Sequence, residues 1–256
     1  MNADRVLLAL ETSGKSGSVA ILRDQDGQLQ CDMEMLSPDS GSAKTLAPAI
    51  ERLLTKHHME MHSLKAIALL TGPGSFTGLR VGVATAKAMA YALSIPTIEV
   101  DTLDVIAQQC PVTSNSIYVV LDAYRGQVFR AEYSIQCVGT SAQMEKLSNT
   151  EIVDIDVLLD RALKRIAGRQ TIDLCGPGCD RIRKYLADPE NARLDISTTI
   201  SERIRWIDGV STFPNAESVA KLGYLKLLAG NVLDPFVLQP RYYRGSAAEE
   251  VAAKGK

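Results

Sequence analysis

The hydrophobic pattern of the chain begins with three short segments typical of strands. Val6–Leu10 and Ser18–Leu22 are mostly apolar, and Leu29–Met35 alternates apolar and polar residues, as half-buried strands do. Asp26-Gly27 stands between the second and third segments, and this dipeptide is typical of a two-residue hairpin turn. We therefore predict a three-stranded antiparallel meander.

Helices and short strands alternate in the next part of the chain. Apolar residues recur at helical spacing from about Ser42 to Lys56, which predicts a first helix. A second helix is predicted from about Thr77 to Leu93, and a third at Leu103–Gln109. The short apolar strands Ala66–Leu70 and Thr97–Val100 separate these helices. The predicted order is βββαβαβα.

The same order begins again after Pro111. Ile117–Leu121 is an apolar strand that ends at Asp122, and a turn with Gly126 leads into a return strand. The turn that ends at Gly17 likewise follows an apolar strand and an acidic residue and leads into a return strand. This similarity indicates an internal duplication of about 110 residues. The later elements predicted in this half are a strand at 128–133, a helix at 155–167, a strand at 171–175, and helices at 180–187 and 216–229.

Two such halves, each with an acidic residue at its first turn, predict an α/β fold with two lobes. This duplicated βββαβαβα arrangement is the fold of actin, hexokinase-type sugar kinases and Hsp70-type heat-shock ATPases (the ASKHA fold). We expect the first lobe at residues 1–111 and the second at 112–256. We also expect the last long helix, at about 216–229, to pack back on the first lobe.

In the ASKHA fold the two first turns hold nucleotide phosphates. The first turn of this chain offers hydroxyl and backbone N–H groups, which suit an anion. Asp122, however, is followed by Ala-Tyr-Arg and not by a second glycine-rich loop. The sequence therefore provides only one of the two phosphate-binding turns that a nucleotide site of this fold needs. The candidate residues for such a site are Glu11, Thr12, Ser13, Gly17 and Asp122.

The segment Gly72–Arg80 reads G-P-G-S-F-T-G-L-R and precedes the second helix. Its glycine spacing differs from the dinucleotide fingerprint, and it lacks the lysine of a P-loop. An anion at the start of the helix is one interpretation. The other, which we favour, is a tight strand-to-helix turn in which Ser75 or Thr77 caps the helix.

The helix after this loop carries two stripes of small residues. One consists of Gly78, Gly82, Ala86 and Ala90, and the other of Ala84, Ala88 and Ala92. Small side chains allow close approach of a neighbour on each face, and one face must pack on the sheet of its own lobe. The other face could serve an internal helix or another subunit.

Charge and cysteine content narrow the class of function. A net charge of −2 and a pI near 6.0 argue against tight, unaided binding of nucleic acid. The five cysteines form no zinc-type pair and, with no signal peptide recognised, they indicate reduced thiols and a cytoplasmic protein. No apolar run approaches the ~18 residues of a membrane span.

Familiar catalytic sets are missing from the sequence. No serine lies in a G-x-S-x-G elbow, and the three histidines fall within one short stretch. His58 and His62 have the spacing of a helical metal pair, but no third ligand is indicated, so we interpret them as surface residues. Two rival functions remain: an ATP-binding small-molecule kinase or ATPase of the ASKHA fold, and a metal-dependent peptidase.

The run Gly72–Arg80 closely resembles the signature of the TsaB (YeaZ) family. Segments that agree in the same order are Leu10–Ser13 with Ser18–Ala20, Leu121–Ala123 with Gly126–Phe129, Pro214–Ser218, and Pro240-x-Tyr242-x-Arg244. The chain departs from the family pattern at Glu11, where an aspartate is usual, and at Gly41–Lys44, which lacks a common His-Ser pair.

This resemblance implies a scaffold without a cofactor. TsaB proteins resemble a degenerate copy of TsaD, the subunit that forms threonylcarbamoyladenosine (t6A) next to the tRNA anticodon. The implied partners are a TsaD-like catalytic subunit and a TsaE-like ATPase, with a homodimer when the chain is alone and only indirect contact with tRNA. The implied interface uses the helices near 43–57 and 77–93, with Leu46, Ile50, Leu53, Leu79, Arg80, Gly82, Val83, Ala86 and Ala90.

The resemblance also implies that a metal site has been lost. TsaD-like proteins carry an H-x-x-x-H motif after the second helix, and laying it on this chain puts Thr102 and Ile106 at the two histidine positions. Isoleucine cannot ligate a metal, and threonine is a poor substitute. We therefore expect neither a metal nor a catalytic residue in this chain.

Overall fold

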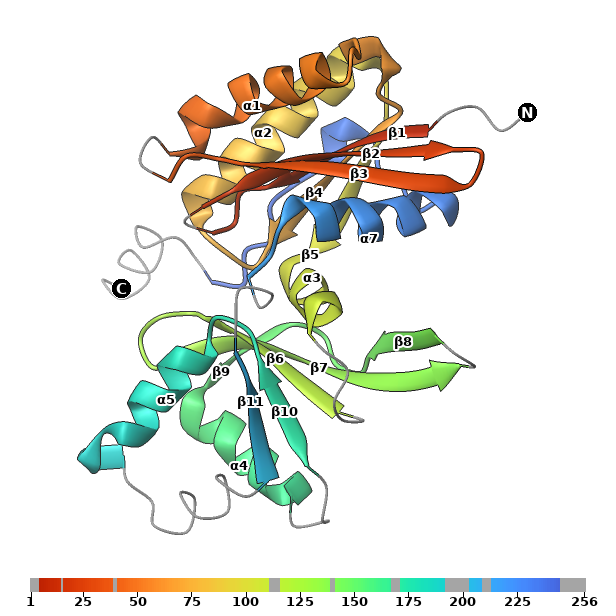
Figure 1. The fold of residues 1–256 in the computed structure, drawn as a ribbon. Coiled ribbons are helices and arrows are strands. Elements are labelled where there is room, and N and C mark those ends of the chain that lie inside the picture. Colours follow the sequence, from red (N-terminus) through yellow and green to blue (C-terminus); the bar gives the residue numbers. More distant parts are fainter. Residues whose placement is uncertain are drawn as a thin grey trace. The chain divides into compact units, whose positions relative to one another are not determined.

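The computed structural model of the chain divides into two compact units. It describes residues 5–14, 16–38, 41–110, 116–138, 141–166, 171–191, 203–208 and 213–244. The first unit is Met1–Val105 with Pro214–Lys256, and the second is Ile106–Phe213. This division differs from the expected boundary after residue 111, because the last part of the chain joins the first unit (Figure 1).

The sheet of the first unit has the strand order β3-β2-β1-β4-β5. Strands β1 (Arg5–Glu11), β2 (Ser18–Gln25) and β3 (Gln28–Met35) form the predicted antiparallel meander. Strands β4 (Ala66–Gly72) and β5 (Thr97–Asp101) add to it in parallel. The hairpin between β2 and β3 turns at Asp26 and Gly27, both with positive φ, which confirms the predicted turn.

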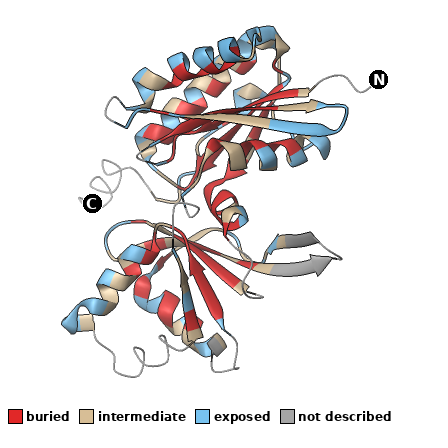
Figure 2. Ribbon diagram, viewed as in Figure 1, coloured by how far each residue is buried: buried red, intermediate tan, exposed pale blue. Residues whose placement is uncertain are grey.

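Helices cover both faces of this sheet. Helices α1 (Ser42–Lys56) and α2 (Phe76–Leu93) pack on one face, and α7 (Ala216–Leu228) packs on the other (Figure 1). Alternate residues of each inner strand point to opposite faces, so β1 is buried on both sides, and the inner strands are coloured as buried in Figure 2. The return of α7 to the first sheet explains why residues 214–244 belong to this unit.

The segment after α7 runs along α2. It includes the short helix η4 (Pro235–Val237), and its residue Leu233 pairs with Thr97 at the free edge of β5. Leu238 is fully buried in the core beneath α1 and α2. Leu238 therefore anchors the segment after α7 in the hydrophobic core of the first unit.

The second unit is built on a mixed sheet of order β11-β10-β6-β7-β8, with β9 also paired to β7. Its core lies between this sheet and helices α4 and α5. The elements are β6 (Ser116–Asp122), β7 (Gln127–Val138), β8 (Ser141–Lys146), β9 (Glu151–Asp154), α4 (Ile155–Ile166), β10 (Ile172–Cys175), α5 (Cys179–Ala187) and β11 (Ile204–Ile207).

Helix α3 (Thr102–Gln109) completes the βββαβαβα order predicted for the first half of the chain. The second half repeats this order from its opening strands through α4, β10, α5 and β11, and the predicted helices at 155–167 and 180–187 correspond to α4 and α5. Strands β8, β9 and β11 were not predicted from the sequence. No helix among the described residues is long and apolar enough to cross a membrane.

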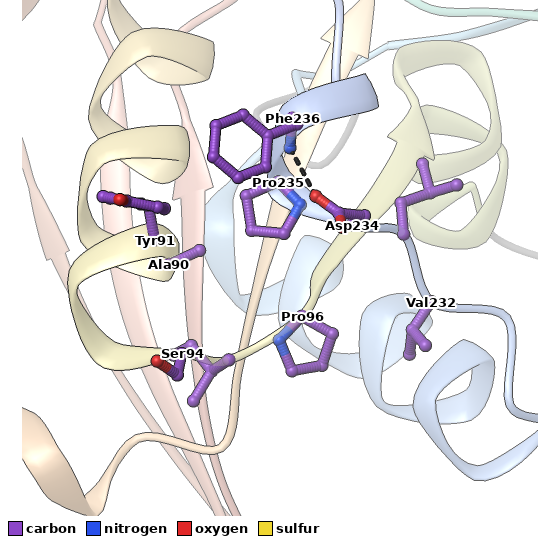
Figure 3. A pocket seen from close by; sticks show the side chains of 10 residues that line it. Ala90, Tyr91, Ser94, Pro96, Val232, Asp234, Pro235 and Phe236 are labelled. Atoms are coloured by element: carbon purple, nitrogen blue, oxygen red, sulfur yellow. Dashed lines mark hydrogen bonds between the residues drawn. The ribbon is translucent and has the colours of Figure 1, made fainter.

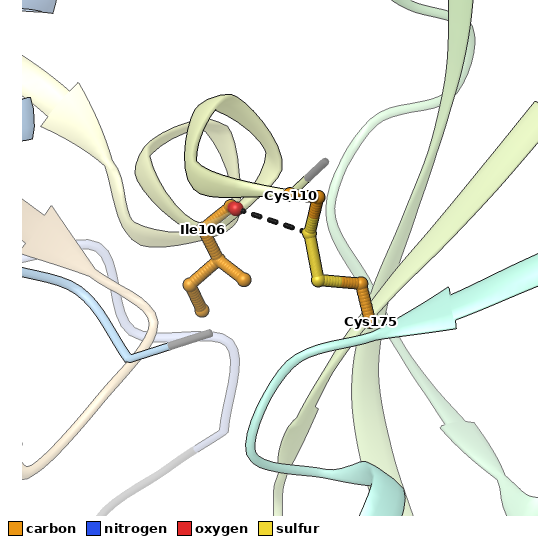
Figure 4. The surroundings of a disulfide bond; sticks show 3 residues. All are labelled: Ile106, Cys110 and Cys175. Carbon is orange, nitrogen blue, oxygen red and sulfur yellow. Dashed lines mark hydrogen bonds between the residues drawn. A yellow bond between two sulfur atoms is a disulfide. The ribbon is translucent and has the colours of Figure 1, made fainter. Parts of the chain in front are cut away.

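The structure corrects the interpretation that all cysteines are reduced thiols. Cys110, just after α3, and Cys175, at the end of β10, form a disulfide within the second unit (Figure 4). They are 65 residues apart in the sequence, with Cα atoms 6.8 Å apart, so sequence spacing gave no sign of the pairing. Of the other described cysteines, Cys31 and Cys179 are free.

Candidate functional site

The turn between β1 and β2 is held by the side chain of Glu11. Oε1 of Glu11 accepts hydrogen bonds from the backbone N–H of Ser13 (2.6 Å), the hydroxyl of Ser13 (2.8 Å) and the backbone N–H of Gly14 (3.2 Å). Its other carboxyl oxygen is buried without a hydrogen-bond partner. Burial raises the pKa of Glu11 to about 7, although the bonds from Ser13 and Gly14 oppose this shift.

The predicted nucleotide-contacting residues of this turn are all buried; they are Glu11, Thr12, Ser13 and Gly17. Lys15 lies outside the described residues. A β-carbon at Gly17 would lie 2.6 Å from the carbonyl oxygen of Glu11, so the turn closes tightly on itself. Two backbone N–H groups of the described part of this turn, those of Ser13 and Gly14, are thus occupied by the carboxyl group of Glu11.

The loop before α2 packs against this turn. The backbone N–H of Ser75 donates to the carbonyl oxygen of Ser13 (2.9 Å), and a β-carbon at Gly74 would lie 2.6 Å from that of Ser13. Ser75 also caps α2, since its hydroxyl accepts from the N–H of Gly78 at 3.3 Å. This confirms the interpretation of Gly72–Arg80 as a strand-to-helix turn.

The first stripe of small residues on α2 serves internal packing. A β-carbon at Gly78 or at Gly82 would clash with the backbone oxygen or the hydroxyl of Thr12. Ala86 and Ala90 follow on the same stripe, fully buried in the core of the first unit. The stripe therefore brings α2 into close contact with the β1–β2 turn and the sheet.

Burial changes the role of the residues predicted to form a partner interface. Eight of the nine have almost no exposed surface, because α1 and α2 turn their apolar stripes toward their own sheet; they are Leu46, Ile50, Leu53, Leu79, Gly82, Val83, Ala86 and Ala90. These side chains hold the helix pair in place, and a partner would have to contact their exposed neighbours.

The exposed neighbours define the outer face of the helix pair. The second stripe of α2, Ala84, Ala88 and Ala92, is exposed, and so are Ala43 and Ala47 of α1. We use "outer face" for these five residues. They present methyl groups and little else, which leaves room for close approach of another backbone.

Arg80, the ninth predicted interface residue, is exposed but held by the chain itself. Its Nε donates to the hydroxyl of Tyr242 (2.8 Å), and its guanidinium lies over the ring of Tyr242. That ring stacks on Phe76 with 4.8 Å between centroids. The segment after α7 therefore fixes the first turn of α2, a contact between residues more than 160 positions apart that sequence patterns did not indicate.

Asp122 belongs to the second unit and is half-buried. Its Oδ1 accepts from the backbone N–H of Tyr124 (2.7 Å). Tyr124, Arg125 and Gly126 all have positive φ. Backbone hydrogen bonds between Ala123, Tyr124 and Gln127 also close the turn. Its residues are Ala-Tyr-Arg-Gly, without the glycine-rich backbone that would cradle phosphates.

Thr102 and Ile106, which the resemblance to TsaD-like proteins puts at the positions of two metal-binding histidines, are both buried. His58 and His62 are exposed. No group of three or more His, Cys, Asp or Glu side chains that could hold a metal occurs among the residues that the structure describes. Burial raises the pKa of Cys31 to about 11 and that of Cys179 to about 12, so neither thiol is a ready nucleophile at neutral pH.

Known proteins resemble this chain in sequence. It matches the family model described as TsaD, tRNA N6-adenosine threonylcarbamoyltransferase, over residues 40–167, half of its length. It is 33% identical over 127 residues to the tRNA threonylcarbamoyladenosine biosynthesis protein TsaB of Bacillus subtilis, and 33% identical over 129 residues to that of Escherichia coli. Each match covers 50% of this chain and 54% of the relative, so the chain spans about half the length of these curated relatives.

Two solved structures resemble the fold over nearly the whole chain. One is an uncharacterized protein with similarity to peptidase YEAZ from Pseudomonas aeruginosa, with a TM-score of 0.70 and 23% identity, covering 94% of this chain and 100% of that one. The other is YeaZ from Pseudomonas aeruginosa, with a TM-score of 0.67 and 22% identity, covering 93% and 99%. The predicted ASKHA-type α/β fold is confirmed.

Proposed function

Since the chain belongs to the TsaB (YeaZ) family, we propose that it serves the formation of t6A in tRNA as a docking subunit and not as the catalyst. Its partner is a TsaD-like catalytic subunit, which a TsaE-like ATPase joins. The complex acts in the cytoplasm, and this chain reaches tRNA only through its partner.

The observation that carries this proposal is the outer face of the helix pair. Ala84, Ala88 and Ala92 repeat every fourth residue, so they lie on one side of α2, and they are exposed while the opposite side is buried. A helix that lies against such a stripe can approach its backbone closely without displacing large side chains. The buried leucines of α1 and α2 pack this helix pair on the sheet of its own unit.

The residues at the lost metal positions support a non-catalytic role. Ile106 has no atom that can ligate a metal, and it is fully buried. Thr102 is also fully buried. A chain with these two side chains depends on its partner for any chemistry that needs a metal there.

The alternative function, an ATP-binding kinase or ATPase, is less well supported by the first turn. The carboxylate of Glu11 accepts from the N–H groups of Ser13 and Gly14, which a phosphate would need. Calorimetry of the pure chain with ATP and magnesium tests this alternative. Tight binding with turnover would replace the docking role by an enzymatic one.

Recovery of partners from the native cytosol tests the proposed function. Affinity-tagged chain is expected to capture the TsaD-like and TsaE-like proteins, and size-exclusion chromatography of the chain alone is expected to show a homodimer that the TsaD-like protein disrupts. Such competition follows if both contacts use the outer face. Capture of neither protein contradicts the proposal.

A further inference from the structure

A cavity of about 360 Å³ opens at the C-terminal end of α2, within the first unit. Figure 3 shows it between the last turn of α2 and the segment that follows α7. Its apolar lining includes Tyr91, Pro96, Val232, Pro235 and Phe236. Cavities of this size admit a small molecule or a long side chain.

Two aromatic rings stand at the rim of this cavity. Tyr91 and Phe236 meet edge to face, with 5.2 Å between centroids and 73° between planes. Tyr91 is 65% exposed and Phe236 is 68% exposed, so the rings do not fill the core of the protein. The negative face of an aromatic ring attracts a cation as well as apolar groups.

The electrostatics of the cavity also favour a cation. Of its lining residues only Asp234 carries a charge at neutral pH, and its Oδ1 accepts from the backbone N–H of Phe236 (2.8 Å). The cavity lies at the negative end of the α2 dipole, and the last turn of α2 has no basic residue. Lys87 contacts the same segment, but its Nζ donates to the carbonyl oxygens of Phe236 and Leu238, and Lys87 does not line the cavity.

We propose that this cavity binds the side chain of an arginine on a partner protein. The planar guanidinium can stack on the exposed face of one ring and meet the edge of the other, because the rings of Tyr91 and Phe236 stand at 73° to each other. It also loses its hydration more readily than an ammonium group. The carboxylate of Asp234 matches its charge, and the methylene stem packs on Val232 and Pro96. The proposal stands on the cavity and does not depend on the identity of the partner.

Titration of the full chain with N-acetyl-arginine N-methylamide, followed by amide NMR shifts, tests the binding. The neutral isostere N-acetyl-citrulline N-methylamide is the matched control. We expect shifts at Ser94, Ile95 and Val232 with a dissociation constant of roughly 1–10 mM, and binding of citrulline about fivefold weaker. Equal binding of the two compounds, shifts confined to other residues, or no binding up to about 50 mM overturns the proposal.

Two variants locate the interaction. Asp234→Asn retains an oxygen that can accept the hydrogen bond from the backbone N–H of Phe236, so we expect the fold to be kept. This variant should bind the arginine compound about fivefold more weakly and the citrulline compound with unchanged affinity. Tyr91→Ala should weaken binding of both compounds. Tyr124→Ala, at another exposed tyrosine, in the second unit, should weaken neither. Unchanged arginine binding by Asp234→Asn also overturns the proposal.

Discussion

Gly78 lies so near the carbonyl oxygen of Thr12 that a β-carbon at Gly78 would be only 1.8 Å from that oxygen. One turn later on α2, Gly82 lies against the hydroxyl of the same threonine. The two glycines therefore allow α2 to pack directly on the β1–β2 turn. This contact sets the position of the helix whose outer face we propose as the docking surface.

Gly78→Ala is expected to destabilise the first unit by about 1–3 kcal/mol, because the added methyl group overpacks a backbone atom that cannot rotate away. Urea denaturation followed by circular dichroism measures the change. Gly14→Ala is the matched control, since a β-carbon there meets only an ordinary contact at 3.8 Å. Equal stability of the two variants would contradict the packing described for α2.

Glu11 should make the stability of the chain depend on pH. Burial raises its pKa from the ordinary value of 4.5 to about 7, so between these values the unfolded chain releases a proton that the folded chain keeps. The contribution of Glu11 to stability is therefore fully present below pH 4.5 and is lost as pH rises through about 7. The loss amounts to roughly 3 kcal/mol at most.

Glu11→Gln removes this titration and leaves an oxygen for Ser13 and Gly14. The free energy of unfolding of the unmodified chain, minus that of the variant, should fall between pH 4.5 and pH 8. Glu60→Gln, at an exposed glutamate, provides the control and should leave the pH profile unchanged. A difference that is flat with pH would mean that Glu11 is ionised at its ordinary pKa.

Tyr242 should stabilise the first turn of α2 in two separable ways. Tyr242→Phe keeps the stack on Phe76 but removes the hydroxyl that accepts from Arg80, and we expect a loss of about 0.5–1 kcal/mol. Tyr242→Ala removes both contacts and should cost about 1–2 kcal/mol. Thermal denaturation separates the two variants, and equal loss in both would assign the whole effect to the hydroxyl.

The disulfide between Cys110 and Cys175 should stabilise the second unit. The double variant with serine at both positions is expected to lose about 2–4 kcal/mol of stability. Alkylation of the denatured chain, followed by mass spectrometry, is the direct check: both cysteines should stay unlabelled until a reductant is added. Complete labelling without reductant would show that Cys110 and Cys175 are free thiols, as the composition of the chain indicated, and would contradict the disulfide.

Local patterns were sufficient to predict much of the fold. The Asp26-Gly27 turn, the strands around it and the limits of α2 follow from residue type and periodicity, which depend on near neighbours. The small strands β8, β9 and β11 were missed: β9 and β11 have only four residues each, and β8 has only two apolar residues, Ala142 and Met144. The return of α7 to the first sheet was expected from its place in the fold, while the stacking of Tyr242 on Phe76 was not.

The candidate site was harder to predict than the fold. Periodicity predicted α1 and α2, while the resemblance to TsaB proteins implied a contact surface that includes Ile50, Val83 and Ala86, all of which are buried. Periodicity shows that a helix has an apolar side without showing which partner that side meets. Here the side meets the chain's own sheet and, through Gly78 and Gly82, a turn more than 60 residues earlier.

The affinity of Ala88→Arg for the TsaD-like subunit, measured by isothermal titration calorimetry, tests the central claim most directly. Ala88 is exposed at the middle of the outer face, so arginine there should not disturb the fold, yet it should weaken binding by about tenfold or more. Ala187→Arg, at an exposed alanine that ends α5 in the second unit, should bind as the unmodified chain does. Unchanged affinity of Ala88→Arg would contradict the proposed docking surface.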